Sequence, residues 1–184
     1  MGIDPAEYAR LREIADRLPK VPGIGKVEIA NGEIVVAMSP MERHELAVHR
    51  IGRQLNAQLP DTHPRYLAHP GADLEDAGLG RLRCPDLMVF PEATLEGDRP
   101  AVLPHEVPLV VEIVSKSNPE NDHGAEVRDY AAMGIPLYLL VDPRKGTGIV
   151  HDEPGYVSRT YFAFGDTVAI GPWRIDTSGL LTYA

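Results

Sequence analysis

The sequence has few of the features that place a protein outside the cell or in a membrane. It contains one cysteine, Cys84, which cannot form a disulfide within the chain. No apolar run approaches the roughly 20 residues that a helix needs to span a bilayer. The N-terminus also lacks the basic start and apolar run of a signal peptide. We therefore expect a cytoplasmic protein that does not enter a membrane.

Positive charge is also scarce in this chain. The 18 Lys and Arg residues are outnumbered by 27 Asp and Glu residues, and the formal net charge is −9. Because nucleic-acid backbones bind clustered Lys and Arg, this balance disfavours tight nonspecific binding to DNA. A nucleic-acid function would therefore need a local basic patch.

Length and composition are those of one globular domain, which we place at residues 1–184. The hydrophobic fraction of 43% and the charged fraction of 24% are ordinary for a folded protein. A domain of this size buries roughly 70% of the surface that its unfolded chain exposes. Neither a metal nor a disulfide is needed merely to keep it folded.

The N-terminal part of the chain predicts a helix followed by a hairpin. Apolar residues recur at helical spacing through Pro5–Leu18, within an N-terminal helical extension at residues 1–24. The dipeptide Asn31-Gly32 separates Lys26–Ala30 from Glu33–Ala37 and is the strongest short-range signal for a tight turn. Two antiparallel strands are therefore expected here.

A second helix is predicted over Pro40–Gln58. Ser39 with Glu42 three residues later forms a capping-box pattern at its start. One stripe of this helix carries His44 together with apolar residues. A different stripe carries three arginines, Arg43, Arg50 and Arg53.

The rest of the chain predicts a loop rich in Gly and Asp at 70–80, then strands with one helix among them. The expected strands are Pro85–Phe90, Pro108–Ser115, Pro136–Val141, Gly148–His151, Val157–Phe164, Thr167–Ile170 and Trp173–Ile175, and the expected helix is Asp122–Met133. Strand, helix and strand in this order imply a crossover between parallel strands. The predicted fold class is α/β (α+β), with a mixed central sheet flanked by helices.

Two carboxylates are the residues most suited to chemistry. Glu112 lies inside the apolar run Leu109–Val114, where a buried carboxylate is costly, and Asp86 begins the preceding strand. Neighbouring strands can bring both together, and two carboxylates that close need a cation, for which Mg²⁺ or Mn²⁺ is suited. The alternative is that Asp86 caps a turn and Glu112 pairs with an arginine.

An ordered series of motifs resembles the Uma-two family. The segments that carry the resemblance are Cys84–Phe90, Val110–Asn118, Asp122, Arg128–Pro136 and Tyr138–Pro143. Members of that family are restriction-endonuclease-like proteins of the PD-(D/E)xK superfamily. The resemblance is strongest over residues 35–142, and it implies a restriction-endonuclease-like core there.

The resemblance also implies a site. It would hold Mg²⁺ between Asp86, Glu112 and the main-chain carbonyl of Ile113, and a bound water would attack a phosphodiester. The early helix of such a fold lies beside the site, which suits His44 or Glu45 as an auxiliary ligand or proton acceptor. For His44, a buried histidine satisfied by one hydrogen bond is the more common case.

The sequence departs from the family where a catalytic lysine is expected. The slot two residues after Glu112 holds Val114, and the slot on the following helix, one turn before Tyr130, holds Glu126. Lys116 would lie about 13 Å from Glu112 along an extended strand, at ~3.3 Å per residue. It could reach the site only if the strand bends.

Two functions therefore remain open. One is a Mg²⁺-dependent endonuclease that hydrolyses DNA, which the retained carboxylates favour. The other is a catalytically impaired nuclease-fold protein that binds nucleic acid or assembles with proteins, which the acidic balance and Glu126 favour. Nucleic-acid contacts are expected at the clustered positive charges, Arg43, Arg50 and Arg53, with Arg81 and Arg83 as further candidates. A homodimer would suit cleavage of two strands, but no heptad or exposed apolar stripe demonstrates one.

Overall fold

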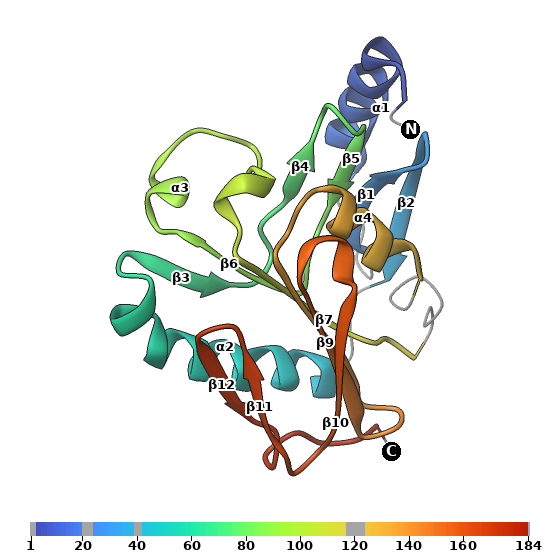
Figure 1. Ribbon diagram of the computed structural model, residues 1–184. Coiled ribbons are helices and arrows are strands. Elements are labelled where there is room, and N and C mark those ends of the chain that lie inside the picture. The colour runs from blue at the N-terminus through green and yellow to red at the C-terminus, as the bar shows by residue number, and fades with distance from the viewer. Residues whose placement is uncertain (1–2, 20–23, 39–41, 117–123, 184) are drawn as a thin grey trace.

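The computed structural model describes residues 3–19, 24–38, 42–116 and 124–183, and Figure 1 shows its ribbon. Its helices are α1 (Pro5–Arg17), α2 (Glu42–Thr62), the short α3 (Ala93–Glu96) and α4 (Glu126–Ala132), with the 3-10 turns η1 (Pro104–Glu106) and η3 (Pro154–Tyr156). No helix in this part of the chain is long and apolar enough to cross a membrane.

The larger sheet has six strands in the order β10-β9-β8-β7-β6-β3. Their bounds are β3 (Tyr66–His69), β6 (Leu87–Pro91), β7 (Leu109–Ile113), β8 (Leu137–Asp142), β9 (Thr147–Asp152) and β10 (Ser158–Ala163). Strands β7 and β8 are parallel, whereas the other neighbours are antiparallel. This mixed sheet with flanking helices confirms the predicted fold class, and the parallel pair confirms the predicted strand–helix–strand unit.

A smaller sheet has the strand order β2-β1-β5-β4. Its strands are β1 (Ile24–Ala30), β2 (Glu33–Met38), β4 (Leu74–Asp76) and β5 (Arg81–Arg83). The predicted hairpin of β1 and β2 is confirmed, and the φ angles of Asn31 (53°) and Gly32 (78°) are both positive, as a type I′ turn requires. A further hairpin pairs β11 (Thr167–Ile170) with β12 (Trp173–Asp176).

Some predicted element boundaries were wrong. The segment 70–80, expected to be a loop, contains β4, whose Leu74 is fully buried. Three residues are too few to show the alternation by which a strand is recognised. Helix α2 continues beyond Gln58 to Thr62 because Leu59 is buried and Thr62 binds the indole of Trp173. The expected caps or starts at Ser39 and Asp122 lie outside the described residues.

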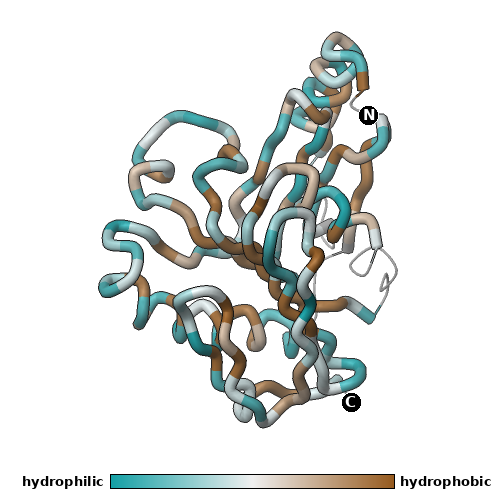
Figure 2. Tube along the Cα trace, in the orientation of Figure 1, coloured by the Kyte–Doolittle hydropathy of each residue, from teal (hydrophilic) through white to brown (hydrophobic). Residues whose placement is uncertain are grey.

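The alternation of side chains along β7 divides the interior into two layers. Leu109, Val111 and Ile113 pack with α2, the β11–β12 hairpin and the same face of the neighbouring strands. Val110 shares the opposite layer with residues of α4, and the same alternation places Glu112 on that side. Figure 2 shows the hydrophobic residues concentrated in these central strands. The expected anomaly is therefore real: Glu112 is a carboxylate in the layer beneath α4.

One buried histidine in β9 predicts how acid affects stability. The ring of His151 lies 5.5 Å from the rings of both Tyr138 and Tyr156, and neither of its nitrogens has a hydrogen-bond partner among the described residues. Burial, assisted by Arg159, lowers the pKa of His151 from its ordinary value of 6.5. The unfolded chain therefore binds this proton more readily than the folded chain does.

Folding stability should consequently decrease as the pH falls below about 6.5, because protonation at this position favours the unfolded state. His151→Phe, which keeps an aromatic ring between the two tyrosines, should reduce that decrease. Urea unfolding at pH 5 and pH 7.5 measures the effect, with exposed His49→Phe as the matched control. Equal pH dependence in the natural protein and His151→Phe would show that His151 is not responsible.

Candidate active site

The two predicted carboxylates meet where the chain passes from the smaller sheet to the larger one. Asp86 lies between β5 and β6, and the pairing of Leu87 with Val111 places Asp86 opposite Glu112. The backbone N–H of Asp86 donates to Glu112 Oε2 at 3.1 Å, and that of Ile113 donates to Asp86 Oδ2 at 2.8 Å. Both side chains are buried. The register of β6 and β7 therefore brings the carboxylates together.

A lysine that the sequence did not single out completes this pair. Lys26 Nζ lies 2.5 Å from Asp86 Oδ1 and 3.7 Å from Glu112 Oε2. Lys26 follows Gly25, where the register of β1 with β2 slips by one residue. Such bulges re-aim the side chains next to them. Burial alone would lower the pKa of Lys26, but Glu112 and Asp86 raise it above its ordinary value, so the amine is charged.

His44 and Tyr130 hold the outer oxygens of the two carboxylates. His44, at the start of α2, places Nε2 3.0 Å from Asp86 Oδ2. Tyr130, on α4, donates its hydroxyl to Glu112 Oε1 at 2.5 Å. Burial and nearby carboxylates, Glu112 first, raise the pKa of Tyr130 well above 10, so the hydroxyl remains a donor. Tyr130 is thus both a fully buried core residue and a direct partner of Glu112.

The site has more acidic side chains than basic ones. Glu126, also on α4, is buried on the side of Glu112. Burial raises the pKa of Glu112 well above its usual range, and Glu126 and Asp86 add to this against the opposing effect of Lys26. Burial would raise the pKa of Asp86 too, but Lys26 and His44 lower it below its usual range. Asp86 is therefore the firmly ionised member of the pair.

The other candidates for the missing lysine lie elsewhere. The Lys116 side chain is exposed, with its ammonium 5.5 Å from the centre of the Tyr183 ring. Val114 is fully buried, and Arg128 is exposed on α4. Neither of the two slots that the family resemblance indicates therefore supplies a cation.

A second buried ionic cluster lies beside the site and was not predicted. Arg83 Nη1 is 2.8 Å from Glu28 Oε2, and its Nε is 3.0 Å from Asp129 Oδ2. Arg81 Nε binds the other oxygen of Asp129 at 2.9 Å. Glu28 also accepts the backbone N–H of Cys84. Arg83 is fully buried, so it is not a surface contact for nucleic acid as the sequence suggested.

The arginine stripe of α2 lies next to the C-terminal segment. Arg43 Nη1 donates to the carbonyl of Thr182 at 2.7 Å, and Arg50 donates to the carbonyl of Gly179. Arg53 is exposed on the same helix. The stripe thus exists, but two of its three guanidinium groups already bind main-chain oxygens.

A cleft of about 680 Å³ opens over Lys26 and Asp86. Its walls come from α1, β1, α2, the β3–β4 connection and the segment before β6, and its charged lining residues are Arg12, Asp16, Lys26, Glu45, Asp73 and Asp86. Four of these six are acids. Among the described residues, no three His, Cys, Asp or Glu side chains converge as a complete metal cage.

Cys84 lies in the same cleft but is not suited to act as a nucleophile. Its thiol donates to Asp73 Oδ1 at 3.0 Å. Burial and the Asp73 carboxylate raise the pKa of the Cys84 thiol far above its ordinary value. The thiol therefore stays protonated and is not an activated nucleophile.

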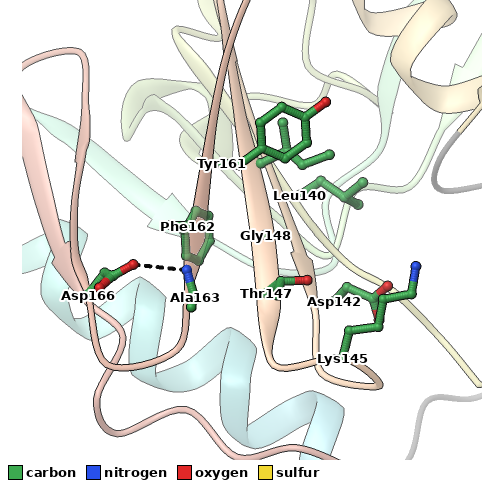
Figure 3. A pocket seen from close by; sticks show the side chains of 10 residues that line it. Leu140, Asp142, Lys145, Thr147, Gly148, Tyr161, Phe162, Ala163 and Asp166 are labelled. Atoms are coloured by element: carbon green, nitrogen blue, oxygen red, sulfur yellow. Dashed lines mark hydrogen bonds between the residues drawn. The ribbon is translucent and has the colours of Figure 1, made fainter.

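Another pocket, of about 390 Å³, lies over β8, β9 and β10 (Figure 3). Its lining includes Asp142, Lys145, Tyr161 and Asp166, and Asp166 accepts the backbone N–H of Ala163 at 2.9 Å. None of the residues that the sequence predicted for chemistry lines it. The cleft over Asp86 is therefore the better candidate active site.

Comparisons with known proteins identify a family and a shared fold. A family model described as "Uma2: Putative restriction endonuclease" matches residues 7–172. A crystal structure described as "a putative nuclease belonging to DUF820" from Anabaena variabilis is similar, with a TM-score of 0.71 at 15% identity over 97% of each chain. At this identity the likeness shows a shared fold. No curated protein matches the chain.

Proposed function

We propose that this chain, which belongs to the Uma2 family of restriction-endonuclease-like proteins, hydrolyses phosphodiester bonds of nucleic acid with a divalent metal ion. One observation carries this proposal. Two buried carboxylates on adjoining strands, Asp86 and Glu112, converge on a single ammonium group at the floor of a cleft. The shared fold of a protein described as "a putative nuclease" supports the same conclusion.

The residues present fit a hard divalent cation. Such ions bind carboxylate and carbonyl oxygens and commonly use only one or two protein carboxylates, with water and substrate phosphate as the remaining ligands. Three acids, Asp86, Glu112 and Glu126, outnumber Lys26 at the site. Burial is the main cause of the raised pKa of Glu112, and Glu126 and Asp86 add to it. A cation would relieve this excess. Restriction-endonuclease-like families generally use a divalent metal, and we propose Mg²⁺ or Mn²⁺ here.

In this proposal Asp86, Glu112 and the carbonyl of Ile113 would hold the ion, and the chemistry it would supply is Lewis-acid polarisation of the phosphate and a lower pKa for a bound water. His44 orients Asp86 through its Oδ2, and Tyr130 orients Glu112 through its Oε1. Ligands held by such outer partners keep their geometry when substrate binds.

Nucleic-acid binding, with DNA as the proposed substrate, would use the arginine stripe of α2. Arg53 is exposed, whereas Arg43 and Arg50 would have to share or release their carbonyl partners. Replacing all three by alanine should weaken binding and flatten its dependence on salt, because fewer phosphate contacts release fewer counterions. An unchanged salt slope in a filter-binding titration would exclude this surface.

A second candidate function has support of its own. Four of the six charged residues lining the cleft are acids, and the chain carries a net charge of −9. Both facts favour a catalytically impaired protein that binds or assembles without cleaving. Metal binding cannot separate the two functions, since an inactive descendant can keep its carboxylates. Turnover is therefore the informative measurement.

The purified full chain should cleave at least one of single- or double-stranded DNA or RNA with Mg²⁺ or Mn²⁺, and EDTA should stop it. Asp86→Asn should reduce the rate by about 10² or more, the scale for one lost electrostatic group in a catalytic site. Exposed Asp98→Asn is the matched control for the same substitution outside the site, and residual cleavage by Asp86→Asn reports contaminating nuclease. Equal cleavage by Asp86→Asn and the natural chain, or no cleavage of any substrate, would reject the nuclease proposal.

A further inference from the structure

The lysine of this site stands at position 26, although the family resemblance places a lysine at position 126. The family resemblance places a lysine there, on α4, but the chain has Glu126, which is buried close enough to Glu112 to raise its pKa. Among the ion pairs of the described residues, Lys26 alone brings a lysine or arginine to Asp86 or Glu112. The cation of the site therefore comes from β1 and not from α4.

The path of β1 explains how this lysine reaches the site. Lys26 and Glu28 alternate with Val27 and Ile29, so the two charged side chains leave β1 on the same face. On the other face Ile29 packs beneath α1. Pairing of Ile29 with Leu82 aligns β1 with β5, which runs directly into Asp86. Lys26 thus projects from a paired strand, next to its bulge, and not from a loop.

Lys26 also faces the space from which a substrate would enter. Its side chain is 26% exposed, compared with 5% for Asp86 and 4% for Glu112, and it lines the cleft. The cleft therefore borders the Lys26 side chain as well as Asp86, so a substrate phosphate in the cleft would lie next to both residues.

We propose that Lys26 is the catalytic lysine of this chain and that it replaces, from β1, the lysine missing at position 126. This inference rests on the proposed function. In hydrolysis the water oxygen forms a bond to phosphorus, the bond from phosphorus to the leaving oxygen breaks, and a proton of the water ends on the leaving group. Lys26 stays an ammonium throughout and offsets the negative charge that grows on the phosphate oxygens.

The test moves the positive charge between the two positions. Lys26→Met should lower kcat for metal-dependent cleavage by about 10²–10³-fold, the loss typical of one such group, and leave KM nearly unchanged. Glu126→Lys in the Lys26→Met background should restore at least a tenth of the natural activity. Lys26→Arg keeps the charge and should retain more activity than Lys26→Met. Lys145→Met, beside the other pocket, is the control expected to have no effect.

Mn²⁺ binding, followed by isothermal titration calorimetry, provides a readout that does not depend on turnover. Lys26→Met should still bind Mn²⁺ and should give the circular dichroism spectrum of the folded chain. If removal of Lys26 instead leaves cleavage unchanged, or raises both Mn²⁺ affinity and activity, the lysine is only a counter-ion and the proposal is wrong.

Lys116 provides the competing assignment. If Lys116→Met abolishes cleavage while Lys26→Met does not, the catalytic lysine comes from the end of β7 and the assignment of Lys26 is overturned. If the natural chain binds Mn²⁺ but cleaves none of the substrates, the proposed function itself fails. Failure of the proposed function can be distinguished from failure of the Lys26 assignment, because it is seen with the natural chain before any lysine is replaced.

Discussion

Replacing Arg83 with methionine is expected to lower the free energy of unfolding by about 3–5 kcal/mol, the usual cost of removing one partner from a buried ionic group. Arg83 is fully buried and binds both Glu28 and Asp129. Methionine fills part of the same volume but offers no charge. Among the described residues, Glu28 would then keep the N–H of Cys84 and Asp129 would keep Arg81.

Urea unfolding at pH 7 measures this loss, with Arg159→Met on β10 as the control, because Arg159 is exposed. Adding Glu28→Gln to Arg83→Met should recover part of the stability, because position 28 then carries no charge that lacks a counter-ion and Asp129 still binds Arg81. A loss below about 1 kcal/mol for Arg83→Met would mean that water or rearrangement compensates for the missing cation. In that case the cluster is not a major determinant of the fold.

Local signals in the sequence were sufficient for most of the fold. The Asn31-Gly32 dipeptide needs positive φ at both residues, which is a property of the turn itself and does not depend on distant contacts. The long apolar run around Glu112 likewise indicated a strand buried on both faces. Strand β4 and the last turn of α2 were missed because distant contacts stabilise them, such as the bond from Trp173 to Thr62.

The sequence identified the site only through a residue whose burial costs free energy unless it has a partner. Glu112 drew attention because a carboxylate in an apolar strand needs a partner, and the neighbouring strand then pointed to Asp86. Lys26 gave no such signal, because a lysine alternating with apolar residues is ordinary in a half-exposed hairpin. Its contact with Asp86 spans 60 positions in the chain. No local pattern states which face of a hairpin will pack against a site so distant in sequence.

Distance along the sequence also explains why Arg83 was wrongly expected to be a surface contact for nucleic acid. In sequence it belongs with Arg81 to a short charged stretch that resembles an exposed basic patch. The structure places it between β1 and α4, where Glu28 and Asp129 meet it from both sides. Whether a basic residue is a surface contact or an internal counter-ion depends on the acids that the fold brings to it.

Trp173→Ala is expected to lower the free energy of unfolding by about 3–5 kcal/mol, the range for removing a large buried aromatic side chain. Trp173 follows the last residue of the segment 7–172 that the family model matches, yet it is fully buried. Its indole N–H donates to Thr62 Oγ1 at 2.8 Å, and its ring lies 5.0 Å from that of His63. The end of the family match is therefore not the end of the folded core.

This packing links the β11–β12 hairpin to the helix that carries His44. Gln54 and Gln58 of α2 each exchange two hydrogen bonds with the backbone of β12, at Asp176 and Arg174. Trp173→Phe, which keeps a ring but loses the N–H, should cost less than Trp173→Ala, and exposed Tyr161→Ala should cost little. Thermal unfolding of the three variants measures the order of their losses in stability. If Trp173→Ala proves no more harmful than Tyr161→Ala, the hairpin is an attachment, and α2 is held in place by the larger sheet alone.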